Sequence, residues 1–183
     1  MKTMDVLKKW STPRNLLLSL IATVVIISML NYYLQVLVYD VYGNYIMPDT
    51  RFCYTFEEIQ AVFDGLGSQG LQVWSTVHLL DYFFPLVYML AMVFAIGLEL
   101  KKLNIFERYD KVLLLPILGC IADYTENILV QSQVFAFPNI SAIVINVASY
   151  VTLIKWAFLT LGFVVIILLI LLIIYQRISK ANE

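Results

Sequence analysis

Several ionisable side chains lie inside long apolar stretches of this sequence. The segment HLLDYFFP contains His78 and Asp81, and the segment ADYTENILV contains Asp123 and Glu126. A single lysine, Lys155, interrupts a third apolar stretch. Side chains of these types can bind a proton, a cation or a polar headgroup, and they can also act as general acids and bases.

The spacing of these polar residues places them on common helix faces. Residues three or four positions apart project from the same side of a helix. Small residues such as Gly119, Ala148 and Gly162 continue the same faces, and small residues let helices pack closely in lipid. We therefore expect the polar faces to point into the protein. The predicted polar cluster consists of His78, Asp81, Tyr82, Asp123, Glu126, Asn127 and Lys155.

The predicted polar cluster contains more acidic than basic groups. A single charge at the centre of a transmembrane helix costs about 2.5–3.5 kcal/mol. The carboxylates of Asp81, Asp123 and Glu126 face one lysine, Lys155. Charge balance therefore requires a protonated His78, a neutral carboxyl group or a bound cation.

Three functions are open for such a cluster. The hypothesis that we favour is that it binds or passes a small ligand, a lipid headgroup or a proton. The first alternative is an intramembrane lipid-modifying enzyme or hydrolase, and the second is a structural subunit whose cluster only fixes helix packing. We assign no catalytic residue, metal ligand or cofactor, because the chain has one histidine and its two cysteines lack partners at metal-ligand spacing.

The composition around these residues is that of an integral membrane protein. Hydrophobic residues make up 61% of the chain, charged residues 14%, and the mean hydropathy is +0.83. A soluble protein carries roughly a quarter charged residues. The net charge of −1 argues against a nucleic-acid partner, which would require a basic surface. The expected partner is the lipid bilayer.

Four apolar segments are long enough to cross a bilayer, which takes about 20 residues in a helix. The first is interpreted as a retained helix, because no small-residue cleavage site follows its apolar centre. We therefore predict an all-α, four-transmembrane-helix bundle that forms a single domain over residues 1–183. The predicted spans cover approximately residues 16–39, 73–98, 112–130 and 142–175.

The distribution of lysine and arginine predicts the orientation of these spans. Basic residues gather in the N-terminal tail, in the connection between the second and third spans, and in the C-terminal tail. Positive charge resists translocation, so we predict a multi-pass protein of the cell membrane with both termini cytoplasmic. At about 1.5 Å per residue, Asp81 lies about 30 Å from Lys101. The polar cluster is therefore expected in the outer half of the membrane.

The long connection between the first two spans contains a helix signal. In TFEEIQAVFDGLG, Thr55 and Glu58 have the spacing of a capping box. Apolar residues then recur at helical spacing. We predict a short amphipathic helix in this outer loop, lying on the outer membrane face.

Three motifs occur in order along the last three predicted spans, namely HLLDYFFPLVY, DYTENILV and VTLIKWAF. This combination resembles small, uncharacterised four-pass prokaryotic membrane proteins. The preceding element YTFEEIQAVFDGLGSQG belongs to the same pattern. The resemblance covers the last three spans and implies no activity.

Overall fold

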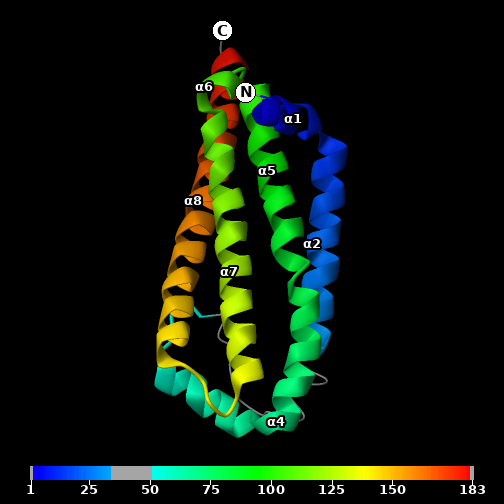
Figure 1. The fold of residues 1–183 in the computed structure, drawn as a ribbon. Helices are drawn as coiled ribbons and strands as arrows, with labels where there is room; N and C mark the ends of the chain where they lie inside the picture. The colour runs from blue at the N-terminus through cyan, green and yellow to red at the C-terminus, as the bar shows by residue number, and fades with distance from the viewer. Residues whose placement is uncertain (1, 34–50, 182–183) are drawn as a thin grey trace.

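The computed structural model of the chain describes residues 2–33 and 51–181, and these residues form helices without any strand (Figure 1). Four helical stretches are long and apolar enough to cross a membrane, which confirms an all-α fold with four helices of spanning length. The elements are α1 (Lys2–Trp10), α2 (Pro13–Tyr33), α4 (Phe56–Asp81), α5 (Phe84–Lys102), α6 (Phe106–Tyr109), the 3-10 helix η3 (Asp110–Leu113), α7 (Leu114–Ala136) and α8 (Ala142–Ala181).

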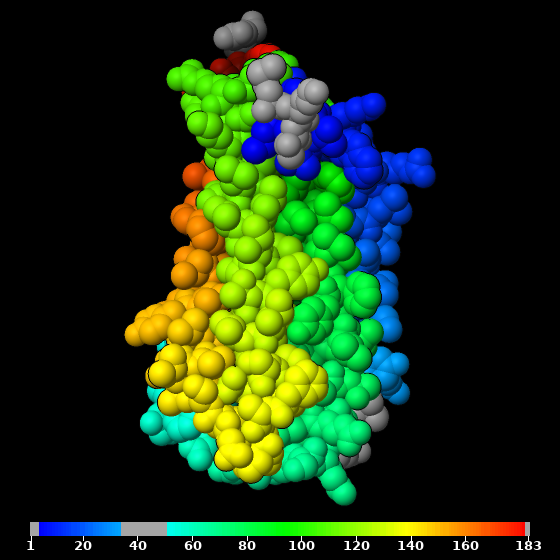
Figure 2. All heavy atoms as spheres, in the orientation of Figure 1, coloured from blue at the N-terminus to red at the C-terminus, as the bar shows by residue number. Residues whose placement is uncertain are grey.

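The long helices run side by side, with both ends of the chain at one end of the bundle (Figure 1). α5 contacts α2, α7 and α8, and the most extensive contact is between α7 and α8. The first part of α4 crosses the opposite end of the bundle (Figure 1). Figure 2 shows side chains filling the space between α7 and its two neighbours on this face. The residues of the predicted polar cluster lie in α4, α7 and α8, except Tyr82, which directly follows α4.

α4 begins with the capping box that the sequence predicts. The Thr55 hydroxyl accepts the N–H of Glu58 at 3.2 Å, and the Glu58 carboxylate accepts the N–H of Thr55 at 2.8 Å. At Gly67 the backbone has φ 59° and ψ 178°, a conformation that residues with a side chain rarely adopt. This glycine divides α4 into an end-crossing part, residues 56–66, and a bundle part, residues 68–81.

The second predicted span is not one continuous helix. α4 ends at Asp81, and α5 begins at Phe84 with Pro85 in its first turn. Proline has no N–H to bond the carbonyl of Asp81, and its ring clashes with that carbonyl. Tyr82 and Phe83 keep right-handed helical backbone angles, so the chain kinks here without forming a loop. The kink places Asp81 at a helix end inside the bundle.

The other spans differ from their predicted bounds mainly in length. α2 ends at Tyr33, and residues 34–39 of the first predicted span lie outside the described residues. α7 continues past Val130 because the amides of Gln131 and Gln133 are buried against the protein and do not end the helix. α8 runs on to Ala181.

The short helix α1 was missed, because nine residues are too few for a span and the sequence was searched for spans. Its last turn is fixed by Lys101 at the end of α5, whose ammonium donates to the carbonyls of Lys8 and Ser11 at 3.1 and 2.8 Å. Lys8 also pairs with Glu107, just after α5 and at the start of α6. These contacts hold α1 across the end of the bundle where both termini lie.

Gly97 is the point where α5 approaches the turn between α1 and α2 most closely. A Cβ at this position would overlap the Ser11 hydroxyl and lie 2.7 Å from the Ser11 Cβ. Because Ser11 is fully buried, we expect Gly97→Ala to destabilise the protein by about 1–3 kcal/mol, measured by SDS-induced unfolding in mixed micelles. Combining it with Ser11→Gly is expected to restore stability.

Gly162→Ala is the matched control for this prediction. Its Cβ would meet only the terminal methyl group of Met92 within 3 Å, and a methionine side chain can move away. An equal loss of stability in the two variants would contradict the close contact at Gly97.

Candidate functional site

The structure brings six of the seven residues of the predicted polar cluster together in the interior of the bundle. They come from the bundle part of α4, the middle of α7 and the first half of α8, and each is buried. The seventh, Tyr82, is half-buried at the edge of the cluster, where its ring lies 5.5 Å from that of His78. The buried residues are His78, Asp81, Asp123, Glu126, Asn127 and Lys155.

One half of the cluster is organised around Lys155, and we call it the lysine half. The Lys155 ammonium lies 2.5 Å from Glu126 Oε2 and 3.6 Å from Asp123 Oδ1. Thr152, one turn earlier on α8, donates its hydroxyl to Glu126 Oε1 at 2.6 Å. Tyr88 of α5 donates its hydroxyl to Asp123 Oδ2 at 2.7 Å. Both carboxylates of α7 are therefore held between α5 and α8.

Tyr54, just before α4, covers the lysine half from the end of the bundle. Its hydroxyl lies 3.4 Å from both Glu126 Oε1 and the Thr152 hydroxyl. Its backbone N–H donates to the Ser149 hydroxyl at 3.0 Å, and Trp156 donates its indole N–H to the carbonyl of Arg51 at 3.0 Å. The chain before α4 is thus bonded to α8 along one face.

The other half of the cluster is organised around His78, and we call it the histidine half. The Nδ1 atom of His78 lies 2.8 Å from the amide oxygen of Gln131, and the Gln131 amide nitrogen donates to Ser75. Nε2 of His78 lies 3.8 Å from Asp81 Oδ2, the same oxygen that accepts from the Asn127 amide at 3.0 Å. Gln131 and Asp81 face the imidazole of His78, and Ser75 and Asn127 bond to these two side chains. All four residues come from α4 and α7.

These contacts fix which nitrogen of His78 carries a hydrogen. The Gln131 amide oxygen can only accept, so Nδ1 must donate to it. Nε2 then faces the Asp81 carboxylate, 3.8 Å from its Oδ2. The Trp74 ring stacks on the imidazole with centroids 5.1 Å apart and an angle of 12° between the planes. The histidine half can therefore hold a proton between Nε2 and Asp81.

α7 joins the two halves, and Tyr124 closes the kink beside them. Asp123, Asn127 and Gln131 follow each other at intervals of four residues, so one stripe of α7 serves both halves. Tyr124 donates its hydroxyl to the carbonyl of Tyr82 at 2.8 Å. This bond supplies a donor to a backbone carbonyl at the kink between α4 and α5.

Sequence reasoning missed five residues that contact the cluster. Gln131, Thr152 and Tyr88 lie at helical spacing from Asn127, Lys155 and Asp81, and extending each polar stripe by one or two turns would have found them. Ser75 lies three residues before His78 on the same face. Tyr54 precedes α4 in the connection between the first two predicted spans, and no periodicity in the sequence relates it to Glu126. The missed residues are Tyr54, Ser75, Tyr88, Gln131 and Thr152.

The arrangement suits proton chemistry better than metal binding. Among residues 2–33 and 51–181, no group of three or more His, Cys, Asp or Glu side chains is placed to hold a metal ion. Each carboxylate of the cluster has a donor on another helix. Asp123 and Glu126 of α7 share Lys155 of α8, and Asp81 of α4 accepts from Asn127 of α7. Compared with protein families, with curated proteins and with solved structures, the chain matches none of them.

Proposed function

We propose that this chain is a multi-pass integral membrane protein that binds a proton at the buried polar cluster and passes it across the bundle. The observation that carries the proposal is the charge balance inside the cluster. Three carboxylates, of Asp81, Asp123 and Glu126, share the interior with one lysine, Lys155, and one histidine, His78. If every carboxylate were ionised, two positive groups would face three negative ones even with His78 protonated.

Burial turns this imbalance into a requirement for an exchangeable proton. His78 is 5% exposed, Lys155 4% and Glu126 0%. An uncompensated carboxylate in such surroundings is far less stable than in water, so one carboxylate of the cluster is expected to take up a proton. The space between Nε2 of His78 and Asp81 is where we place this proton, because both atoms can hold it.

A series of hydrogen-bonding side chains supports passage of the proton as well as its storage. From Ser75 the contacts run through Gln131 and His78 to Asp81 and Asn127. Glu126, the residue before Asn127 on α7, belongs to the lysine half, where it contacts Lys155, Thr152 and Tyr54. The two halves are therefore joined through α7. Intramembrane ionisable residues that line up in this way are typical of proton pathways.

The orientation that we propose follows from the basic residues. Lysines and arginines gather at the end of the bundle where both termini lie, so that end is placed in the cytoplasm of a cell-membrane protein. The end-crossing part of α4 then lies on the outer face. Its apolar residues Ile59, Val62 and Phe63 are buried against the bundle. The proton site therefore lies nearer the outer surface, beneath this helix.

Proton flux into vesicles tests the proposal. The full chain is reconstituted into liposomes with a pH-sensitive dye inside, and a potassium diffusion potential drives the flux. We expect flux above that of empty liposomes. Asp81→Asn keeps the shape of the side chain but cannot exchange a proton with His78, so we expect a loss of at least about tenfold.

Asp64→Asn is the matched control, because Asp64 is an exposed carboxylate on the end-crossing part of α4. It should leave the flux unchanged. Circular dichroism and gel filtration establish that both variants fold. A wild-type flux equal to that of empty liposomes overturns the proposal, and so does an Asp81→Asn variant that folds and passes protons at the wild-type rate. Either result favours a cluster that only fixes helix packing.

A further inference from the structure

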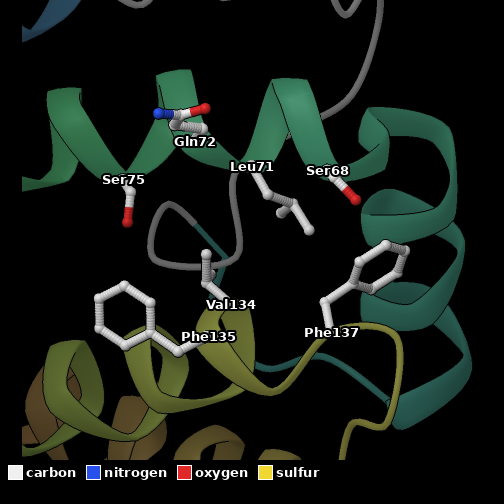
Figure 3. Close-up of a pocket in the computed structure, with 7 residues that line it drawn as sticks. All are labelled: Ser68, Leu71, Gln72, Ser75, Val134, Phe135 and Phe137. Carbon is white, nitrogen blue, oxygen red and sulfur yellow. The ribbon is translucent and has the colours of Figure 1, made fainter.

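Two adjoining cavities lie between the bundle part of α4 and the end of α7. Their volumes are about 260 Å³ and 380 Å³, and both are lined by Gln72, Ser75 and Phe135. Together they form one groove, which we call the α4–α7 groove. Figure 3 shows Ser68, Leu71 and Ser75 pointing from α4 toward the end of α7 across the first of these cavities.

The lining of the groove combines uncharged polar groups with apolar side chains. None of the described residues that line either cavity carries a charge. A phosphate or carboxylate headgroup would therefore find no cation among them to offset the cost of leaving water. The polar lining residues are Ser68, Gln72, Ser75, Thr76, Tyr82 and Gln131.

The rim of the groove faces the surroundings of the bundle with apolar side chains. Leu79 is 64% exposed and Phe135 78% exposed, and both line the second cavity. Two helices that cross a membrane and present such side chains open toward acyl chains, not toward water. A molecule that reaches this groove from the bilayer must bring an apolar body with a polar end.

The inner wall of the groove is in contact with the histidine half of the cluster. Gln131 lines the second cavity, donates its amide to Ser75 on the opposite wall, and accepts from His78 behind it. A hydroxyl group in the groove can reach Gln131 and Ser75, both of which can donate and accept hydrogen bonds. The Gln131 side chain therefore lies between the groove and the buried imidazole of His78.

We infer that the α4–α7 groove binds an uncharged lipid that bears a free hydroxyl group, of which diacylglycerol is the representative. The hydroxyl bonds to Gln131 and Ser75, and the acyl chains leave past Leu79 and Phe135 into the bilayer. The volume accommodates the polar end of such a lipid and leaves its chains in the membrane. The inference does not depend on proton passage, because the lipid hydroxyl can bond to Gln131 and Ser75 whether or not His78 and Asp81 exchange a proton.

Lipid selectivity of the wild-type protein is the first test. The full chain in nanodiscs is exposed to a photoreactive diacylglycerol, and unlabelled lipids compete for the crosslink. We expect diacylglycerol to compete at least about tenfold better than phosphatidic acid, which adds a phosphate, or triacylglycerol, which lacks the hydroxyl. Equal competition by phosphatidic acid or triacylglycerol overturns the inference, since it identifies contact with bulk lipid only.

A variant that fills the groove is the second test. Ser75→Phe places a ring between α4 and α7, and we expect it to lower the crosslink at least about tenfold. Ser28→Phe makes the same change at an exposed position of α2, far along the chain from the groove, and should leave the crosslink unchanged. If Ser75→Phe folds and still binds, the site lies elsewhere.

The two proposals fail in different measurements. Loss of diacylglycerol selectivity with normal proton flux overturns the groove and leaves the proton site standing. If the wild-type protein shows no proton flux above empty liposomes but keeps its diacylglycerol selectivity, the proton site is overturned and the groove stands. Asp81→Asn is not part of the groove lining and is expected to keep its diacylglycerol crosslink within about twofold of wild type.

Discussion

Replacing Lys155 by methionine is expected to destabilise the protein by about 3–5 kcal/mol. Methionine has a similar length but removes the ammonium that lies 2.5 Å from Glu126 and 3.6 Å from Asp123. Both carboxylates stay buried in the variant, and removal of one partner from a buried ion pair leaves an uncompensated charge. SDS-induced unfolding in mixed micelles measures the loss.

A compensating change separates charge from packing in this experiment. Adding Glu126→Gln to Lys155→Met removes one of the stranded charges and keeps the hydrogen bond from Thr152, so most of the stability should return. Lys180→Met, at an exposed position near the end of α8, should stay within about 0.5 kcal/mol of wild type. A loss below about 1 kcal/mol for Lys155→Met alone would mean that its carboxylate partners are already neutral. The charge balance behind the proposed proton site would then be wrong.

The parts of this site that depend on one helix at a time could be predicted from the sequence. Hydropathy identified the four apolar stretches because each is long and apolar enough by its own composition to cross a membrane. The stripe of α8 predicted to face inward contains Ala148, Lys155 and Gly162, and all three are buried. A helix fixes which residues share a face, so periodicity alone was enough to find the buried side.

The parts that depend on how helices dock could not be predicted. The pairing of Lys155 with Glu126 rather than with Asp81 is set by the rotation and height of α8 relative to α7, which composition does not encode. Pro85 removes the helical bond to the carbonyl of Asp81, but the bond from Tyr124 goes to the carbonyl of Tyr82, which lies in the two-residue kink. Such contacts are decided by tertiary packing.

Tyr54 marks the limit of pattern-based reasoning most clearly. It belongs to no span, and its partners Ser149 and Glu126 are distant in sequence. The docking of the end-crossing part of α4 on the bundle, together with the bonds from α8 to residues 51 and 54, brings it to the lysine half. The position of Tyr54 over the lysine half therefore depends in part on the apolar contacts between the end-crossing part of α4 and the bundle.

Phe63→Ala is expected to destabilise the protein by about 3–5 kcal/mol for this reason. Phe63 is fully buried, and its ring lies 6.0 Å from that of Trp74 and 6.3 Å from that of Phe137. It therefore ties the end-crossing part of α4 both to the bundle part of α4 and to the end of α7. Truncation leaves a cavity that the neighbouring rings cannot fill without moving the helix.

Phe163→Ala is the matched control, because Phe163 is 56% exposed on α8 and should lose less than about 1 kcal/mol. Hydrogen exchange followed by mass spectrometry adds a local measure, since loosening of the helix should speed exchange over residues 54–66 before the rest of the bundle. Equal losses in the two phenylalanine variants would mean that the helix is not docked through Phe63. Tyr54 could then not be held against Glu126, because the residues that follow it would have no fixed place on the bundle.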